Sequence, residues 1–116
     1  MLRTKTIRAA LLTACALGCS DGGGSAASVD PLVDRGRQVY QNVCVACHHG
    51  NPAVDGSLGP AIAGASRELL EAKVLRAEYP PGYTPKRPGG VTMPAFAYLA
   101  EEIDALAAYL AQDPPK

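Results

Sequence analysis

Apolar residues recur at helical spacing in the segment that follows Asp30. Each of them has another three or four positions away, which places them on one face of a helix. The positions on this face are Leu32, Val33, Gly36, Val39, Tyr40 and Val43. Asp30 is suited to cap the helix, and Pro31 has the fixed φ angle favoured in a first turn. The pattern predicts a helix from Pro31 to about Cys44.

A second helix is predicted after Ser66, which can cap its N-terminus and is followed by acidic residues in the first turns. Three apolar positions at helical spacing would face inward: Leu69, Leu70 and Val74. Pro80 and Pro81 are expected to end this helix, because proline interrupts helical hydrogen bonding.

The last predicted helix begins near Glu101 and ends before Pro114 and Pro115. Its buried face comprises Ile103, Leu106, Ala107 and Leu110. The segments 49–65 and 80–94 are rich in glycine and proline and are predicted to be loops. Because no run of β-branched residues alternates with a period of two, the predicted fold class is all-α, with three main helices.

The N-terminal segment has the pattern of a secretory signal. Arg3, Lys5 and Arg8 form a basic start, and residues 9–17 form an apolar run. This run is too short to span a membrane as a helix. We expect residues 1–18 to be a signal peptide, residues 19–29 a flexible tether rich in glycine and serine, and residues 30–116 the folded domain.

The end of this signal resembles the lipobox of bacterial lipoproteins. Residues 16–19 read Ala-Leu-Gly-Cys, so Cys19 would carry the lipid and become the new N-terminus. Residues 12–15, which end at Cys15, match the same pattern with a shorter apolar run. An ordinary secretory signal with incidental cysteines is the alternative. The lipoprotein interpretation predicts a protein anchored to the membrane on the periplasmic side of the cell envelope.

Removal of the signal also changes the charge balance. The whole chain has eleven basic and eleven acidic side chains, and three of the basic ones lie in the signal. The remaining eight basic and eleven acidic side chains give a net charge of about −3. A negative domain is a poor partner for nucleic acid, which requires basic surfaces.

Cys44, Cys47 and His48 form a Cys-x-x-Cys-His motif, CVACH. Thiols at this spacing can reach two vinyl groups on one edge of a porphyrin, while the next residue directs its imidazole at the iron; the motif is typical of c-type haem attachment. A thioredoxin-like site would require a βαβ context, which is missing. A zinc site would need four ligands, and His49 would make a cramped set. A disulfide would close only a small loop.

Met93 is the candidate for a second axial ligand opposite His48. His49 adjoins His48 and cannot reach the other face of the haem, so we expect it to face solvent. Met93 is the only methionine besides Met1, and it lies in a loop rich in proline and glycine. A thioether ligand favours ferrous iron. The alternative is a methionine that fills a gap in the core.

In its motifs and in their order along the sequence, the chain resembles the bacterial single-haem class I cytochromes c. The motifs are Gly36 with Tyr40, then CVACH, then Leu58-Gly59-Pro60, then Thr92-Met93-Pro94, then Leu106 with Tyr109. The resemblance implies that Gly36 allows the first and last helices to cross closely, with both tyrosines at the crossing. It also implies that the carbonyl of Pro60 accepts the proton of the axial imidazole.

The chain departs from this family at one point, because it contains no tryptophan. Family members often place a tryptophan near a haem propionate. In this chain Tyr79, Tyr83, Lys86 or Arg87 could take that place. Alternatively, the loop that contains them is simply solvated.

These features predict an electron carrier with one covalent haem c that cycles between ferrous and ferric iron, and not an enzyme. Its partners would be redox proteins such as a dehydrogenase, an oxidase or another cytochrome. The protein would serve them as a general shuttle or as a subunit dedicated to one complex. If Met93 is labile or absent from the iron, a gas sensor or a peroxidase-like enzyme is the alternative. Because the aromatic content is low, the chain is expected to be largely unfolded without haem.

Overall fold

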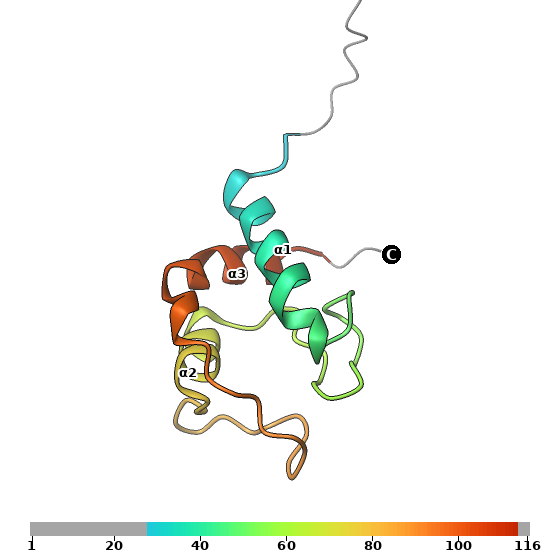
Figure 1. The fold of residues 1–116 in the computed structure, drawn as a ribbon, viewed down its shortest axis with the longest axis vertical. Coiled ribbons are helices and arrows are strands. Elements are labelled where there is room, and N and C mark those ends of the chain that lie inside the picture. Colours follow the sequence, from blue (N-terminus) through green and yellow to red (C-terminus); the bar gives the residue numbers. More distant parts are fainter. Residues whose placement is uncertain (1–27, 114–116) are drawn as a thin grey trace, which may run out of the picture.

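The computed structural model describes residues 28–113 (Figure 1). The predicted signal peptide, Cys15, Cys19 and most of the tether lie outside these residues. The elements, in chain order, are α1 (Pro31–Val43), η1 (Cys44–Ala46), α2 (Arg67–Arg76), η2 (Ala97–Glu102) and α3 (Ile103–Leu110). The described part of the chain contains no strand, and the predicted all-α class is confirmed.

Helix α1 begins where its capping residues predict. The side chain of Asp30 accepts a hydrogen bond from the backbone N–H of Leu32 at 2.8 Å, and Pro31 occupies the first turn. The helix ends at Val43 and continues directly into the 3₁₀ turn η1. Within that turn the backbone N–H groups of Cys47 and His48 both donate to the carbonyl of Cys44, at 3.1 and 2.9 Å. The CVACH motif is therefore one tight turn at the end of a helix.

Helix α2 is capped as expected but ends earlier than the prolines suggest. The hydroxyl of Ser66 accepts from the N–H of Leu69 at 3.2 Å. The helix ends because Ala77 adopts a left-handed conformation, with φ at 58°. The N–H of Glu78 then closes onto the carbonyl of Ala72 at 3.1 Å, a bond that satisfies one of the last helical carbonyls. Pro80 lies beyond this turn and does not determine it.

The last helical region begins before Glu101, as the 3₁₀ helix η2, and becomes α-helical only at Ile103. It ends at Leu110, ahead of the prolines that were expected to end it. The predicted inward face is largely confirmed, because Ile103, Leu106 and Leu110 are fully buried and Ala107 is half-buried.

Helices α1 and α3 cross in close contact (Figure 1). A Cβ atom on Gly36 would lie 1.9 Å from the carbonyl oxygen of Ala105, so only glycine fits there. The rings of Tyr40 and Tyr109 pack at the same crossing, with centroids 5.4 Å apart. The crossing that the family resemblance implies is present.

One hydrophobic cluster joins α1, α2, η2 and α3. Its buried members are Val39, Tyr40, Leu70, Val74, Leu99, Ile103, Leu106 and Leu110. Partly buried residues of the loops 49–66 and 77–96, among them Ile62 and Met93, pack against this cluster. None of the helices between residues 28 and 113 has the length and apolar character needed to cross a membrane.

Candidate functional site

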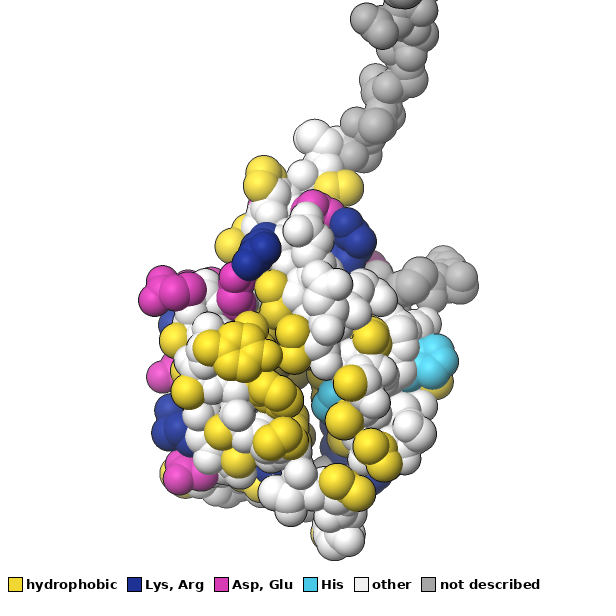
Figure 2. Space-filling view, viewed as in Figure 1, with side chains coloured by type: hydrophobic (Ala, Val, Ile, Leu, Met, Phe, Trp, Pro, Cys, Tyr) yellow, Lys and Arg dark blue, Asp and Glu magenta, His cyan; other side chains and the backbone are white. Residues whose placement is uncertain are grey.

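A cleft lies between the CVACH turn and α2, and residues of the two long loops complete its lining. It encloses about 1100 Å³ of empty space, part of it open to solvent. Figure 2 shows this cleft opening on one face, with hydrophobic side chains along both rims and a histidine in its wall. Most of its walls are apolar; the apolar lining residues include Leu58, Ile62, Ala65, Leu69, Leu70, Val74, Leu106 and Leu110. Several of these residues belong to the hydrophobic core, so the cleft reaches into the centre of the domain.

Cys44 and Cys47 both line the cleft, and the structure contains no disulfide between them. The thiol of Cys44 is half-buried, and this burial raises its pKa to about 11. It is therefore a protonated thiol at neutral pH. Two free thiols separated by one turn meet the requirement for a double covalent attachment at one end of the cleft.

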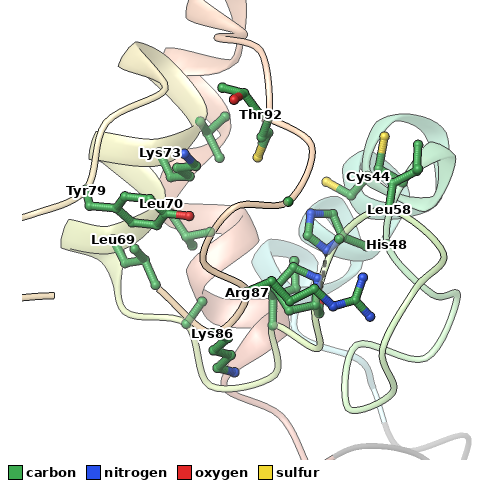
Figure 3. Close-up of a pocket in the computed structure, with 18 of the residues that line it drawn as sticks. Cys44, His48, Leu58, Leu69, Leu70, Lys73, Tyr79, Lys86, Arg87 and Thr92 are labelled. Atoms are coloured by element: carbon green, nitrogen blue, oxygen red, sulfur yellow. Dashed lines mark hydrogen bonds between the residues drawn. The ribbon is translucent and has the colours of Figure 1, made fainter. Parts of the chain in front are cut away.

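His48 has a defined tautomer. Its Nδ1 atom lies 2.9 Å from the carbonyl oxygen of Pro60 (Figure 3). A carbonyl oxygen only accepts hydrogen bonds, so the proton must reside on Nδ1. The Nε2 atom therefore keeps a free lone pair, as a metal-binding imidazole requires.

Gly59 packs against the face of the His48 ring. A Cβ atom at this position would lie 2.4 Å from Cε1 of His48 and 2.6 Å from Nδ1. Real Cβ atoms do not approach so closely, so the loop can lie on the ring only with glycine at this position. Together, Gly59 and Pro60 fix the orientation of the imidazole.

Met93 lines the same cleft from a different segment of the chain. Figure 3 shows Thr92, the preceding residue, across the cleft from His48. Met93 is half-buried and packs against the hydrophobic core. The segment is held to α2 by the N–H of Phe96, which donates to the carbonyl of Val74 at 2.6 Å. The two candidate axial ligands are thus brought to one cleft by elements far apart in the sequence.

His49 does not join this group. Its side chain is exposed, and its Nδ1 accepts a hydrogen bond from the N–H of Asn51 at 2.9 Å. Its carbonyl accepts from the hydroxyl of Tyr40 at 2.5 Å, which ties the CVACH turn to α1. Residues 28–113 contain no group of three or more His, Cys, Asp or Glu side chains arranged to hold a metal ion. The alternative zinc site therefore finds no ligand set in this part of the chain.

The four residues considered as propionate neighbours, Tyr79, Tyr83, Lys86 and Arg87, all line the cleft. Lys73 of α2 also lines it and was not anticipated. Its ammonium group lies 4.0 Å from the centre of the Tyr79 ring, and Tyr79 stacks on Tyr83 with centroids 5.3 Å apart. Only the fold could identify Lys73, because a lysine near the end of a helix is otherwise expected to be solvated.

Residues 31–110 match the model of a protein family described as cytochrome c oxidase, cbb3-type, subunit III. The chain belongs to this family. No curated protein and no solved structure matches it significantly. The family confirms the expected small monohaem cytochrome c domain, with covalently bound haem c and a role as a haem-based electron carrier.

The cleft of this cytochrome domain fits a haem by the chemistry of its donors. It offers two thiols, an imidazole with a free Nε2 and a thioether, within apolar walls. An apolar macrocycle gains free energy from burial against such walls. Haem c supplies the redox-active iron; the protein supplies attachment, ligation and the surrounding polarity.

Proposed function

We propose that the protein transfers electrons through a haem c iron ligated by His48 and Met93, with the haem attached through Cys44 and Cys47. The observation that carries this proposal is that His48, whose Nε2 keeps a free lone pair, and Met93 both line one cleft. Two permanent protein ligands leave no coordination position for a substrate. Electron exchange then needs little rearrangement of either side chain.

The two proposed ligands would have opposite effects on the reduction potential of the iron. The hydrogen bond from Nδ1 of His48 to Pro60 makes the imidazole a stronger donor. A methionine thioether has the opposite tendency, because it favours ferrous iron and raises the reduction potential. The pair is suited to a carrier that both accepts and releases electrons.

The first test is the absorption spectrum of the haem-loaded protein, oxidised and then reduced. We expect sharp low-spin ferrous bands and a weak far-red band from a bond between sulfur and ferric iron. The far-red band should vanish in Met93→Ala and persist in Thr92→Ala, the matched control from the same segment. A high-spin spectrum with rapid carbon monoxide binding in the wild type would contradict Met93 ligation and favour a gas sensor or a peroxidase.

We further propose that the protein acts outside the cytoplasm, on the periplasmic side, anchored through a lipid on Cys19. The 13-residue helix α1 separates the end of the tether from the CVACH turn by about 20 Å. An anchor attached at that end would leave the cleft free for partners. Labelled palmitate should be incorporated by the wild type and by Cys15→Ser, but not by Cys19→Ser. The reverse pattern would assign the lipid to Cys15, and no incorporation would indicate an ordinary signal.

The partners proposed for this carrier are redox proteins of the respiratory membrane. The description of the family names a subunit of a cytochrome c oxidase, which makes an oxidase the first candidate. Gentle solubilisation followed by affinity purification of the tagged chain tests this proposal. Stoichiometric co-purification of an oxidase would favour a dedicated subunit, whereas purification of the chain alone would favour a general shuttle.

A further inference from the structure

The charge of the cleft is opposite to the charge of the domain. Residues 28–113 contain seven basic and ten acidic side chains. The lining of the cleft nevertheless includes Lys73, Lys86 and Arg87, and none of its described residues is aspartate or glutamate. Cationic groups without carboxylates in an otherwise apolar cleft indicate a ligand that carries negative charge on an apolar body.

Lys86 and Arg87 are concentrated at one end of the cleft. In Figure 3, Lys86 lies at the end opposite Cys44, and Arg87 lies below His48. Lys73 is not equivalent to them, because its ammonium group is engaged by the ring of Tyr79 and donates to the carbonyl of Ala77 at 3.3 Å. The attachment end and the cationic end are thus separated along the cleft.

Both cations are held in place by the loop that carries Pro60. The ammonium group of Lys86 donates to the carbonyl of Ala61 at 2.7 Å. The guanidinium of Arg87 donates to the carbonyl of Gly56 at 3.0 Å, and its Nη2 lies 3.7 Å from the carboxylate of Asp55. Asp55 is itself fixed by the N–H of Ala61 at 2.7 Å. A lysine has three N–H donors and an arginine five, so these contacts leave donors on both side chains for an anion.

We infer that Lys86 and Arg87 bind the two carboxylates of the haem, and that Asp55 positions the guanidinium. This inference rests on the proposed haem function of the cleft. Haem has an apolar body, with attachment positions on one edge and two carboxylates on another. The cleft is complementary to it: the walls are apolar, two thiols lie at one end and two cations lie at the other. The chain contains no tryptophan to bind a carboxylate through an indole N–H. Cationic partners also form stronger hydrogen bonds to carboxylates than neutral donors do.

The test compares three single variants of the haem-loaded protein with the wild type. Two of them, Lys86→Gln and Arg87→Gln, remove a cation, and the third, Arg76→Gln, is the control. Arg76 is exposed, pairs with Glu78 and does not line the cleft. The absorption spectrum is recorded first. Unchanged low-spin bands with the far-red band establish that haem attachment and His48/Met93 ligation are intact, which separates a failure of this inference from a failure of the proposed function. Arg87→Lys, which keeps the charge, serves as a second variant if Arg87→Gln does not fold.

Two readouts are expected to change. A nearby cation disfavours ferric iron, so each glutamine variant should shift the reduction equilibrium about tenfold toward the ferric form, which lowers the potential by about 59 mV. In haem labelled with ¹³C at its carboxylates, each glutamine variant should move mainly one of the two carboxylate NMR signals. The control should change neither. The inference would be overturned if neither glutamine variant moved the carboxylate signals, or if the control moved them equally. Lys86 and Arg87 would then serve only to connect two loops by hydrogen bonds.

Discussion

Gly36 of α1 lies directly against the backbone carbonyl of Ala105 in α3, with no space for a Cβ atom between them. The Cβ of an alanine at this position would meet backbone atoms, which cannot rotate away. Gly36→Ala is therefore expected to force the two helices apart and to lower the free energy of unfolding by about 1–3 kcal/mol. Gly50→Ala is the control, because a Cβ at Gly50 would meet nothing within 4 Å. Chemical denaturation of the haem-loaded proteins checks this; equal midpoints for the two variants would contradict it.

A second substitution to alanine probes the imidazole. In Gly59→Ala the new Cβ would overlap the ring of His48, so the ring must tilt and its hydrogen bond to Pro60 must lengthen. We expect a weakened far-red band and a changed electron paramagnetic resonance spectrum of the ferric protein. Gly90→Ala, also beside the cleft, adds a Cβ no closer than 3.6 Å to its neighbours and should keep the wild-type spectrum. Identical spectra for both variants would contradict a packing role for Gly59.

Loss of the haem should unfold most of the domain. Leu70, Leu106 and Leu110 belong to the hydrophobic core and also line the cleft, so a haem in the cleft would pack directly against the core and form part of it. A ligand that binds only the folded state contributes its binding free energy to stability. We expect the Cys44→Ala, Cys47→Ala double variant to lose most of its helical circular dichroism. A cooperative, native-like melt of this variant would contradict the prediction.

Acid should weaken the contact between α1 and the region that precedes α3. Arg35 forms an ion pair with Glu102, and its hydrogen bonds hold the pKa of Glu102 below the ordinary value of 4.5. A carboxyl group with a lowered folded pKa stabilises the fold above its unfolded pKa, and this contribution is lost as the pH falls through the folded pKa. Below about pH 4.5, the melting temperature of the wild type should therefore fall more steeply than that of Glu102→Gln.

The matched control for this pH series is Glu101→Gln. Glu101 is exposed and takes part in none of the ion pairs formed within residues 28–113. Its replacement should leave the steep acid slope of the wild type unchanged. The same slope in all three proteins would show that the ion pair of Glu102 does not contribute to acid sensitivity.

Much of the site could be predicted because its chemistry is local in the sequence. The thiols and imidazole of CVACH are adjacent, and the caps Asp30 and Ser66 act on the first turns that follow them. Met93 is predicted as a ligand by elimination, because the domain contains no other methionine. These inferences needed residue types and spacing, but no knowledge of which segments meet in space.

The remaining features depend on contacts between distant segments. Neither the sequence around Lys86 nor that around Ala61 indicates that a bond joins them across 25 positions. The early end of α2 depends on a left-handed Ala77, a conformation that alanine rarely adopts and that the sequence pattern does not indicate. Lys73 is a cleft residue only because α2 packs with that face toward the CVACH turn. Such features follow from the packed fold and not from the periodicity of any one segment.

The crossing of α1 and α3 also constrains the order of events during biosynthesis. Helix α3 follows every other described element along the chain and is synthesised after them, yet α1 has its most extensive helix contact with it. A nascent chain that ends near Met93 already carries every proposed ligand and both cations. It lacks α3, the helix against which Gly36 and Tyr40 pack. The two thiols therefore emerge on a chain that cannot yet close its cleft. Enzymes that attach haem would meet Cys44 and Cys47 in an accessible, unfolded segment, and folding would follow attachment.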